Sequence, residues 1–150
     1  MELRLPPLAQ LFIFALVMWL LDRTAPGPAF ALPAQRVLPL VVALLGVAIA
    51  LAGVLAFRAQ DTTVDPRYPQ NTRVVVSQGI YRVSRNPMYV GMLLLLVAWG
   101  LHLASIWPLL LLPLFVLAMS VLQIRPEERA MRMQFGERYD DYCRRVRRWL

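Results

Sequence analysis

The chain contains a run of 37 residues, 88–124, that carries no formally charged side chain. A helix rises about 1.5 Å per residue, so roughly 20 apolar residues cross the ~30 Å hydrocarbon core of a bilayer. The run is therefore long enough for two crossings. Its middle, from His102 to Pro108, holds its polar cluster and a helix-breaking proline. We predict a helical hairpin here, with spans near 88–104 and 106–124.

Two shorter apolar runs precede the hairpin. Residues 37–57 are uncharged over 21 positions, which is enough for one crossing. Residues 8–21 are also uncharged, and this helix can begin near residue 5 because proline is tolerated in a first helical turn. The sequence therefore predicts an all-α integral membrane protein of one domain, residues 1–150. Its four transmembrane helices are expected near 5–21, 37–57, 88–104 and 106–124.

The composition supports this class of protein and excludes others. Hydrophobic residues make up 59% of the chain, a larger share than in an ordinary soluble domain. Charged residues make up 17%, which is a smaller share. Intrinsic disorder is excluded because it requires low hydrophobicity. The seven glycines form neither a dinucleotide-binding fingerprint nor a phosphate-binding loop. With one cysteine, the chain has no cysteine pair for an internal disulfide, a zinc site or an iron–sulfur site.

The first apolar run has an alternative interpretation. Arg4, the run 8–21 and the small residues around Ala29 and Ala31 are together typical of a secretory signal with its cleavage site. We favour a retained span, because the charged pair at residues 22–23 directly follows the apolar run.

The distribution of arginine predicts the orientation. All sixteen basic side chains are arginine. With four spans, fourteen of them lie on the side of the termini and of segment 58–87, and two, Arg23 and Arg36, lie on the other side. Because basic residues collect on the cytoplasmic side, we expect both termini in the cytoplasm. The net charge of +7 then suits anionic membrane lipids as partners, and not nucleic acid.

The polar segment 125–150 has the pattern of a cytoplasmic amphipathic helix. Its apolar side chains recur at steps of three and four residues, which is one face of a helix. They are Met131, Phe135, Tyr139, Tyr142, Val146 and Trp149. Gly136 can kink this helix or divide it in two. The pattern alone also fits a helix that only lies on the membrane surface.

A polar group precedes the hairpin on its cytoplasmic side. Asn86 and Pro87 are typical of the cap and the first position of a helix. The free N–H groups at such a helix start, beside Arg82 and Arg85, favour a carboxylate or a phosphate.

A second polar group follows the hairpin. Glu127 and Glu128 are adjacent at the expected bilayer boundary, where carboxylates are costly to place. Arg125 and Arg129 flank them. A purely structural alternative stays open, in which the two acids belong to a first helical turn and pair with Arg132.

Taken in order, these motifs resemble a known family. Residues 79–91 (GIYRVSRNPMYVG), an apolar hairpin, residues 125–129 (RPEER) and residues 135–142 (FGERYDDY) resemble the isoprenylcysteine carboxyl methyltransferase family, and most closely its small bacterial members. The resemblance covers about residues 61–150. It implies an integral-membrane methyltransferase of a bacterial inner membrane. Such an enzyme uses S-adenosyl-L-methionine as co-substrate and no metal. The last two spans and the C-terminal segment would build its cofactor pocket.

The resemblance also implies site residues. The family's cofactor contacts correspond to Arg73, Val74, Val75, Val76, Tyr81, Asn86, Pro87, Met88, Tyr89 and Glu127. Glu127 would accept hydrogen bonds from hydroxyl or ammonium groups of the cofactor, and the two tyrosines would pack on its adenosyl part. The expected catalytic residues are Arg85, Arg125 and Glu128, and either arginine can hold an acceptor carboxylate through paired N–H bonds.

Two positions depart from the family's pattern. Asn86 stands where the family usually has the histidine of Arg-His-Pro, and an amide cannot titrate near neutral pH. Gln123 stands near the position of a substrate-binding arginine, with Arg125 two residues further on. We therefore expect the acceptor among membrane-embedded or amphiphilic molecules, such as an isoprenoid or lipid carboxylate or thiol.

Other functions stay open at this point. Sterol-type reductases carry a similar Arg-His-Pro element before a span, but they are longer and have more spans. Phospholipid N-methyltransferases differ in the acceptor and not in the mechanism. A non-enzymatic assembly factor or lipid-binding protein would show no saturable binding of S-adenosylmethionine. Outside the site, we expect His102 to be an interfacial hydrogen-bonding residue and Cys143 a solvated surface cysteine.

Overall fold

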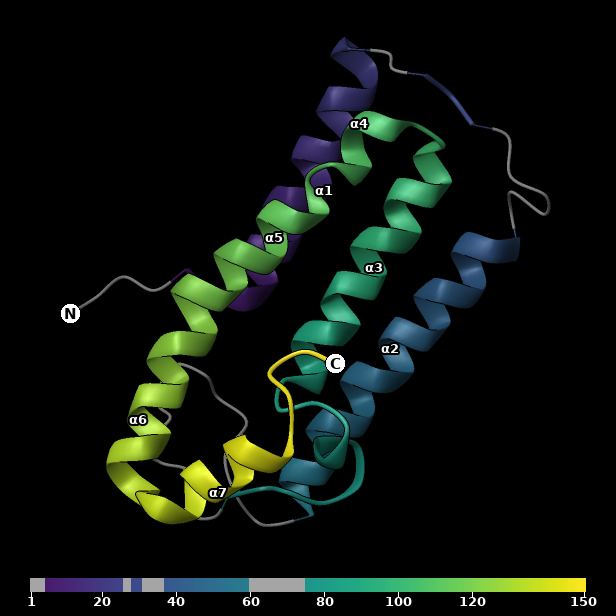
Figure 1. The fold of residues 1–150 in the computed structure, drawn as a ribbon. Helices are drawn as coiled ribbons and strands as arrows, with labels where there is room; N and C mark the ends of the chain where they lie inside the picture. The colour runs from purple at the N-terminus through teal and green to yellow at the C-terminus, as the bar shows by residue number, and fades with distance from the viewer. Residues whose placement is uncertain (1–4, 26–27, 31–36, 60–74) are drawn as a thin grey trace.

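The computed structural model of the chain describes residues 5–25, 28–30, 37–59 and 75–150. Over these residues the fold is helical, apart from an isolated β-bridge between Ala29 and Ser105. The helices are α1 (Pro7–Thr24), α2 (Val37–Arg58), α3 (Pro87–Leu103), α4 (Ile106–Leu109), α5 (Leu112–Met119), α6 (Arg125–Phe135) and α7 (Glu137–Arg145). A 3-10 helix spans Gly79–Arg82, and a π-helix spans Ser120–Ile124. Figure 1 shows α3 side by side with α2. Helix α1 packs against α3 and α4.

Among the described residues, three helices are long and apolar enough to cross a membrane. They are Pro7–Thr24, Val37–Arg58 and the continuous helix Ile106–Phe135, while the apolar α3 is shorter, with 17 residues. α2 agrees with the predicted span 37–57 to within one residue. The prediction of an all-helical chain with apolar helices of membrane-spanning length is confirmed for these segments.

The helix that contains α4, α5 and α6 does not stop where the charge-free run stops. We predicted a span that ends near residue 124, but the helix continues through the π-turn Ser120–Ile124 to Phe135. Pro126 lies just after this π-helix, and the helix continues past it to Phe135. The polar residues that follow the apolar run are therefore held on the same rigid element as the run itself.

The predicted hairpin turn is present, but its breaking residue is a different one. Ala104 ends α3 in the left-handed conformation, with φ 53°, and α4 begins at Ile106. Pro108 lies inside the first turn of α4, where proline is compatible with a helix, so it does not make the turn. The backbone N–H of Phe30 donates to the Ala104 carbonyl at 3.1 Å, which ties the residues after α1 to this turn.

Glycines let α2 and α3 approach until their backbones touch. A Cβ placed on Gly91 of α3 would lie 2.5 Å from the Gly46 carbonyl oxygen and 2.8 Å from the Cβ of Ala50, both on α2. Gly53 allows a similar approach to Met88. This contact fixes the start of α3, which carries several of the expected site residues, against the end of α2.

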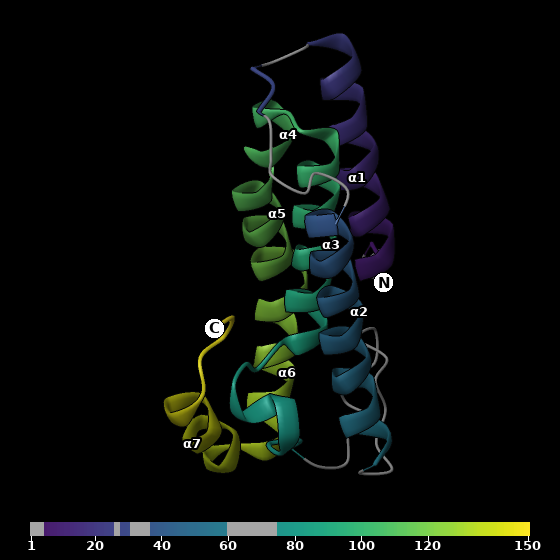
Figure 2. The same cartoon turned by 90° about the vertical axis from the view of Figure 1, so that its right-hand side faces the viewer.

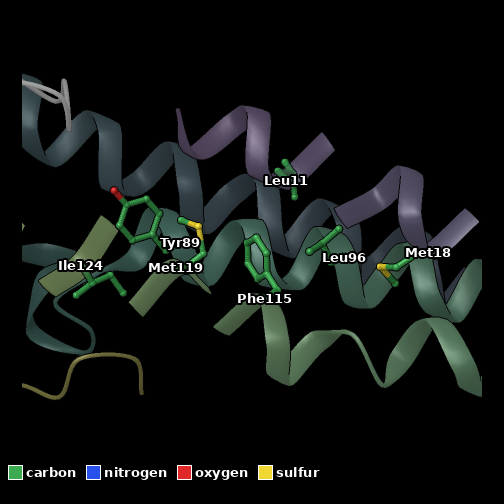
Figure 3. Packing of buried hydrophobic residues seen from close by; sticks show 7 residues of the cluster. All are labelled: Leu11, Met18, Tyr89, Leu96, Phe115, Met119 and Ile124. Carbon is green, nitrogen blue, oxygen red and sulfur yellow. The ribbon is translucent and has the colours of Figure 1, made fainter. Parts of the chain in front are cut away.

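The buried core lies between α1, α3 and α5. Figure 3 shows its side chains following one another along the helices, from Ile124 and Tyr89 at one end to Met18 at the other. Phe115 of α5 is fully buried and meets Phe14 of α1 edge to face, with ring centroids 5.2 Å apart. These contacts make α1 an integral part of the bundle.

The C-terminal segment changes direction at Gly136, as its sequence allowed. Gly136 has φ 53° and divides the segment into α6 and α7, and α7 lies to one side of α6 (Figure 2). The apolar stripe packs onto the protein, since Tyr139 and Tyr142 form a buried cluster with Val76 and Tyr81. The predicted helix ends early, however. α7 stops at Arg145, and the extended residues after it turn back toward the start of α3 (Figure 1).

Candidate active site

The first element of the candidate site is the 3-10 helix Gly79–Arg82. Gly79 begins it with φ 58°, a conformation that glycine adopts without strain. The turn buries Tyr81, which is 4% exposed, and its ring meets Phe57 of α2 edge to face at 5.3 Å. The Tyr142 hydroxyl donates to the Tyr81 carbonyl at 2.8 Å. The turn is thus held between the end of α2 and α7.

The second element is the start of α3. Asn86 and Pro87 occupy the cap and first positions, as predicted, but the Asn86 side chain makes no capping hydrogen bond. Its Nδ2 donates to the Arg148 carbonyl at 2.8 Å, and its backbone N–H donates to the Ser84 hydroxyl at 3.1 Å. The predicted capping role of the Asn86 amide is therefore wrong, because the amide holds the C-terminal segment.

A tyrosine–glutamate pair joins α3 to α6. The Tyr89 hydroxyl donates to Oε1 of Glu127 at 2.5 Å, across 38 positions of sequence. Tyr81 lies close to this pair. Burial raises the pKa of the Tyr81 hydroxyl well above its usual range, and the nearby Tyr142 and Glu127 raise it further. The Tyr81 phenol therefore stays protonated and can donate a hydrogen bond.

The Tyr81 hydroxyl oxygen is buried, and among the described residues it has no hydrogen-bond partner. A buried polar group without a partner costs free energy, so such groups are usually satisfied by protein, water or ligand. Its position beside Glu127 and Tyr89 marks a place where a polar ligand would gain a hydrogen bond.

A second polar cluster surrounds Glu128. Its carboxylate lies 3.2 Å from Nη2 of Arg85 and accepts hydrogen bonds from Arg148, from Nε at 3.0 Å and from Nη2 at 2.7 Å. Nη1 of Arg85 also donates to Sγ of Cys143. Cys143 is half-buried, so the expectation of a solvated surface cysteine is wrong.

The structure brings most of the expected residues together in two neighbouring groups. One contains Tyr81, Tyr89 and Glu127, and the other contains Arg85 and Glu128. Close to them, Val76 is buried beside Tyr81, Val75 is packed on the same cluster, Pro87 is buried at the start of α3, and Met88 contacts α2. Arg125 is exposed at the start of α6. Arg73 and Val74 lie outside the described residues.

Two residues of this region were not predicted. Arg148 binds Glu128, and the Trp149 indole donates to the Ser120 hydroxyl at 3.1 Å. The apolar stripe included Trp149, but only as the last position of a helix. Arg132, proposed as a partner of the adjacent acids, instead pairs with Asp140 at 3.0 Å. His102, outside the site, stacks on Trp99 with ring centroids 5.5 Å apart.

The chemistry of these side chains suits an organic ligand with polar donors and an apolar or aromatic part. A carboxylate, two phenols and an adjacent apolar cluster provide acceptors and flat packing surfaces. Among the described residues, no three His, Cys, Asp or Glu side chains are grouped in a way that could hold a metal ion.

Comparison with known proteins identifies the family. The profile of the phospholipid methyltransferase family matches residues 34–138, well over half of the chain. The chain belongs to the phospholipid methyltransferase family. An uncharacterized protein from Haemophilus influenzae is 40% identical to the chain over 63 residues, which are the whole of that protein and 42% of this chain. No solved structure matches the chain.

Membership of this family confirms the resemblance inferred from the motifs, because the family is of the isoprenylcysteine carboxyl methyltransferase type. It indicates a membrane methyltransferase and favours that activity over a sterol-type reductase. The matched region begins before α2 and ends within α7, so it includes Tyr81, Tyr89 and Glu127.

Proposed function

We propose that the chain is an S-adenosylmethionine-dependent methyltransferase (EC 2.1.1 class) acting on a membrane-embedded or amphiphilic acceptor. One observation supports this most strongly. In a chain of a methyltransferase family, the buried Tyr81 hydroxyl lacks a partner among the described residues and lies beside the Tyr89–Glu127 pair. A ligand that carries hydroxyl and ammonium groups fits this set of side chains.

Each residue then has a distinct role in cofactor binding. Glu127 accepts from hydroxyl or ammonium donors, while Tyr81 supplies a protonated hydroxyl and an aromatic edge. Tyr89 orients the Glu127 carboxylate through their hydrogen bond. By the family resemblance, the residues that precede Tyr81 and those at the start of α3 complete the pocket. They are Arg73, Val74, Val75, Val76, Asn86, Pro87 and Met88.

The proposed reaction depends mainly on the positioning of the acceptor relative to the methyl group. Bound S-adenosylmethionine supplies a methyl group activated by a sulfonium, which an acceptor atom displaces in line. The chain's part is to hold the acceptor at the correct distance and angle and to exclude water. If the acceptor atom is already anionic, little proton movement is needed. Asn86, which cannot titrate near neutral pH, is compatible with such a site.

The acceptor is a lipid or a lipid-like molecule in this proposal. The family's description names phospholipids, and the motif resemblance points to isoprenoid or lipid carboxylates and thiols. Arg125, exposed at the start of α6, can hold a carboxylate or phosphate group of such an acceptor. Arg85 and Glu128 act together as an ion pair in this proposal, because their side chains contact each other and are largely buried.

Binding and transfer test this function directly. Detergent-solubilised protein should bind S-adenosylmethionine saturably and transfer its labelled methyl group to a component of host membranes, which is then identified by mass spectrometry. A non-enzymatic scaffold would bind no S-adenosylmethionine and label nothing, and that result would refute the proposal.

We also propose four spans, with α3 as the third and both termini in the cytoplasm of a bacterial inner membrane. Single cysteines in a Cys143→Ser background distinguish this from three spans. Cysteine at exposed Arg58 and at exposed Arg144 should be labelled from the same, cytoplasmic side, and cysteine at Thr24 from the opposite side. If α3 does not cross, positions 58 and 144 will be labelled from opposite sides.

A further inference from the structure

Residues 146–150 form a strap that crosses from α7 to the two helices of the candidate site. They are not helical, and Val146 has extended backbone angles, φ −125° and ψ 135°. The strap is held by its carbonyl groups, by the Arg148 guanidinium and by the Trp149 indole. These contacts reach different elements of the fold.

One set of contacts ties the strap to the start of α3. The backbone N–H of Arg85 donates to the Arg147 carbonyl at 3.0 Å, and Nδ2 of Asn86 donates to the Arg148 carbonyl at 2.8 Å. The Ser84 hydroxyl lies 3.5 Å from the same Arg148 carbonyl. Tyr89 follows on α3, within one helical turn of Asn86.

The other set ties the strap to the long helix. Arg148 makes two hydrogen bonds to Glu128, the neighbour of Glu127, and the Trp149 indole donates to Ser120 at the beginning of the π-turn. Trp149 also packs against the buried core that contains Tyr89. The strap therefore bridges the two helices whose side chains form the Tyr89–Glu127 pair.

The charges around Glu128 allow the strap to detach from the long helix. Arg85 and Glu128 are nearly buried, with side chains 10% and 5% exposed, whereas Arg148 is 37% exposed. If Arg148 leaves, Arg85 still compensates the Glu128 carboxylate, and the departing guanidinium becomes hydrated. Opening the strap therefore leaves no buried charge without a partner, which is the costly event in breaking buried ion pairs.

We propose that residues 146–150 are a positioning strap for the site, with Arg148 and Glu128 as its latch. Closed, the strap holds α3 against α6 and so fixes the Tyr89–Glu127 pair. Open, it admits the cofactor to Tyr81 and Glu127, a step that rests on the proposed function. Glu128 is then a positioning residue that acts through Arg148 and Arg85, and not a group that touches the reacting atoms.

Amide hydrogen exchange without cofactor tests the strap itself. Arg148→Met removes the latch, and Arg144→Met is its matched control, because Arg144 pairs with Asp141 on the exposed face of α7. The Arg85 amide, which donates to the strap, should exchange about tenfold faster in Arg148→Met and at the wild-type rate in the control. Trp149→Phe, which removes only the indole donor, should have a smaller effect in the same direction. Unchanged exchange at Arg85 in both strap variants would overturn the proposal.

Cofactor kinetics test the opening step separately. If the strap gates the site, Arg148→Met should make both association and dissociation of S-adenosylmethionine faster, by about tenfold, and Arg144→Met should change neither. A residue with a merely structural role would not make association faster. Faster exchange at Arg85 with an unchanged association rate would refute the gate. Absence of binding to the wild type would refute the proposed function, while the exchange result would still decide whether the strap is latched.

Discussion

Replacing Glu127 by glutamine should weaken binding of S-adenosylmethionine by about tenfold or more, since a hydrogen bond to a charged group contributes about 1.5–3 kcal/mol. The substitution keeps the shape of the side chain and its bond from Tyr89, whose hydroxyl now lies 2.5 Å from Oε1. What it removes is the negative charge that the cofactor's ammonium or hydroxyl donors would meet. Isothermal titration of the solubilised protein measures the change.

Glu137→Gln is the matched control, because Glu137 is exposed in the first turn of α7 and undergoes the same chemical change. Its affinity for the cofactor should equal that of the wild type. Tyr81→Phe provides a second comparison within the site, since it removes only the hydroxyl that lacks a partner among the described residues. Wild-type affinity in Glu127→Gln would remove Glu127 from the cofactor site.

Local sequence features predicted the helices well, because hydrophobicity and charge are properties of the segment itself. The limits of α2 follow from an uncharged run that ends at Arg58. The turn between α3 and α4 was harder to predict. A proline normally marks a break, but Pro108 fits a first helical turn, and Ala104 adopts the left-handed conformation instead. The residue type does not predict this conformation of Ala104, whose carbonyl accepts a tertiary hydrogen bond from the Phe30 N–H.

The sequence predicted only those residues of the candidate site that lie in recognisable motifs. The order of motifs indicated that Tyr81, Tyr89 and Glu127 belong together, and their proximity in the structure agrees with this. No local pattern distinguishes Arg148 from the other seven arginines of residues 125–150. Only the path of the chain after Arg145 brings Arg148 to Glu128.

The adjacent glutamates illustrate how a fold can separate two neighbouring residues of one type. Successive positions on a helix point in different directions, about 100° apart. Glu127 therefore meets Tyr89, while Glu128 meets Arg85 and Arg148. The sequence could assign both to one site, but the two carboxylates have different partners and different expected roles.

Loss of the Glu128 charge should destabilise the protein more than loss of any other carboxylate described above. Glu128→Gln leaves Arg85, only 10% exposed, without its anionic partner, and breaking a buried pair in this way costs about 3–5 kcal/mol. For a chain of this size the Tm should fall by roughly 10 °C, measured by thermal unfolding in detergent. Arg148→Met should cost much less, because Arg85 still compensates Glu128.

Asp141→Asn is the control for this effect. It makes the same carboxylate-to-amide change in an exposed ion pair, in which the Arg144 side chain is 71% exposed and the Asp141 side chain 57%. Exposed pairs contribute only about 0–1 kcal/mol. Its Tm should therefore stay within a few degrees of the wild-type value. If Glu128→Gln and Asp141→Asn lower the Tm equally, Glu128 does not compensate a buried charge. The Arg148 latch would then lack the energetic asymmetry on which its release depends, because that asymmetry requires Arg85 to be the buried partner and Arg148 the hydrated one.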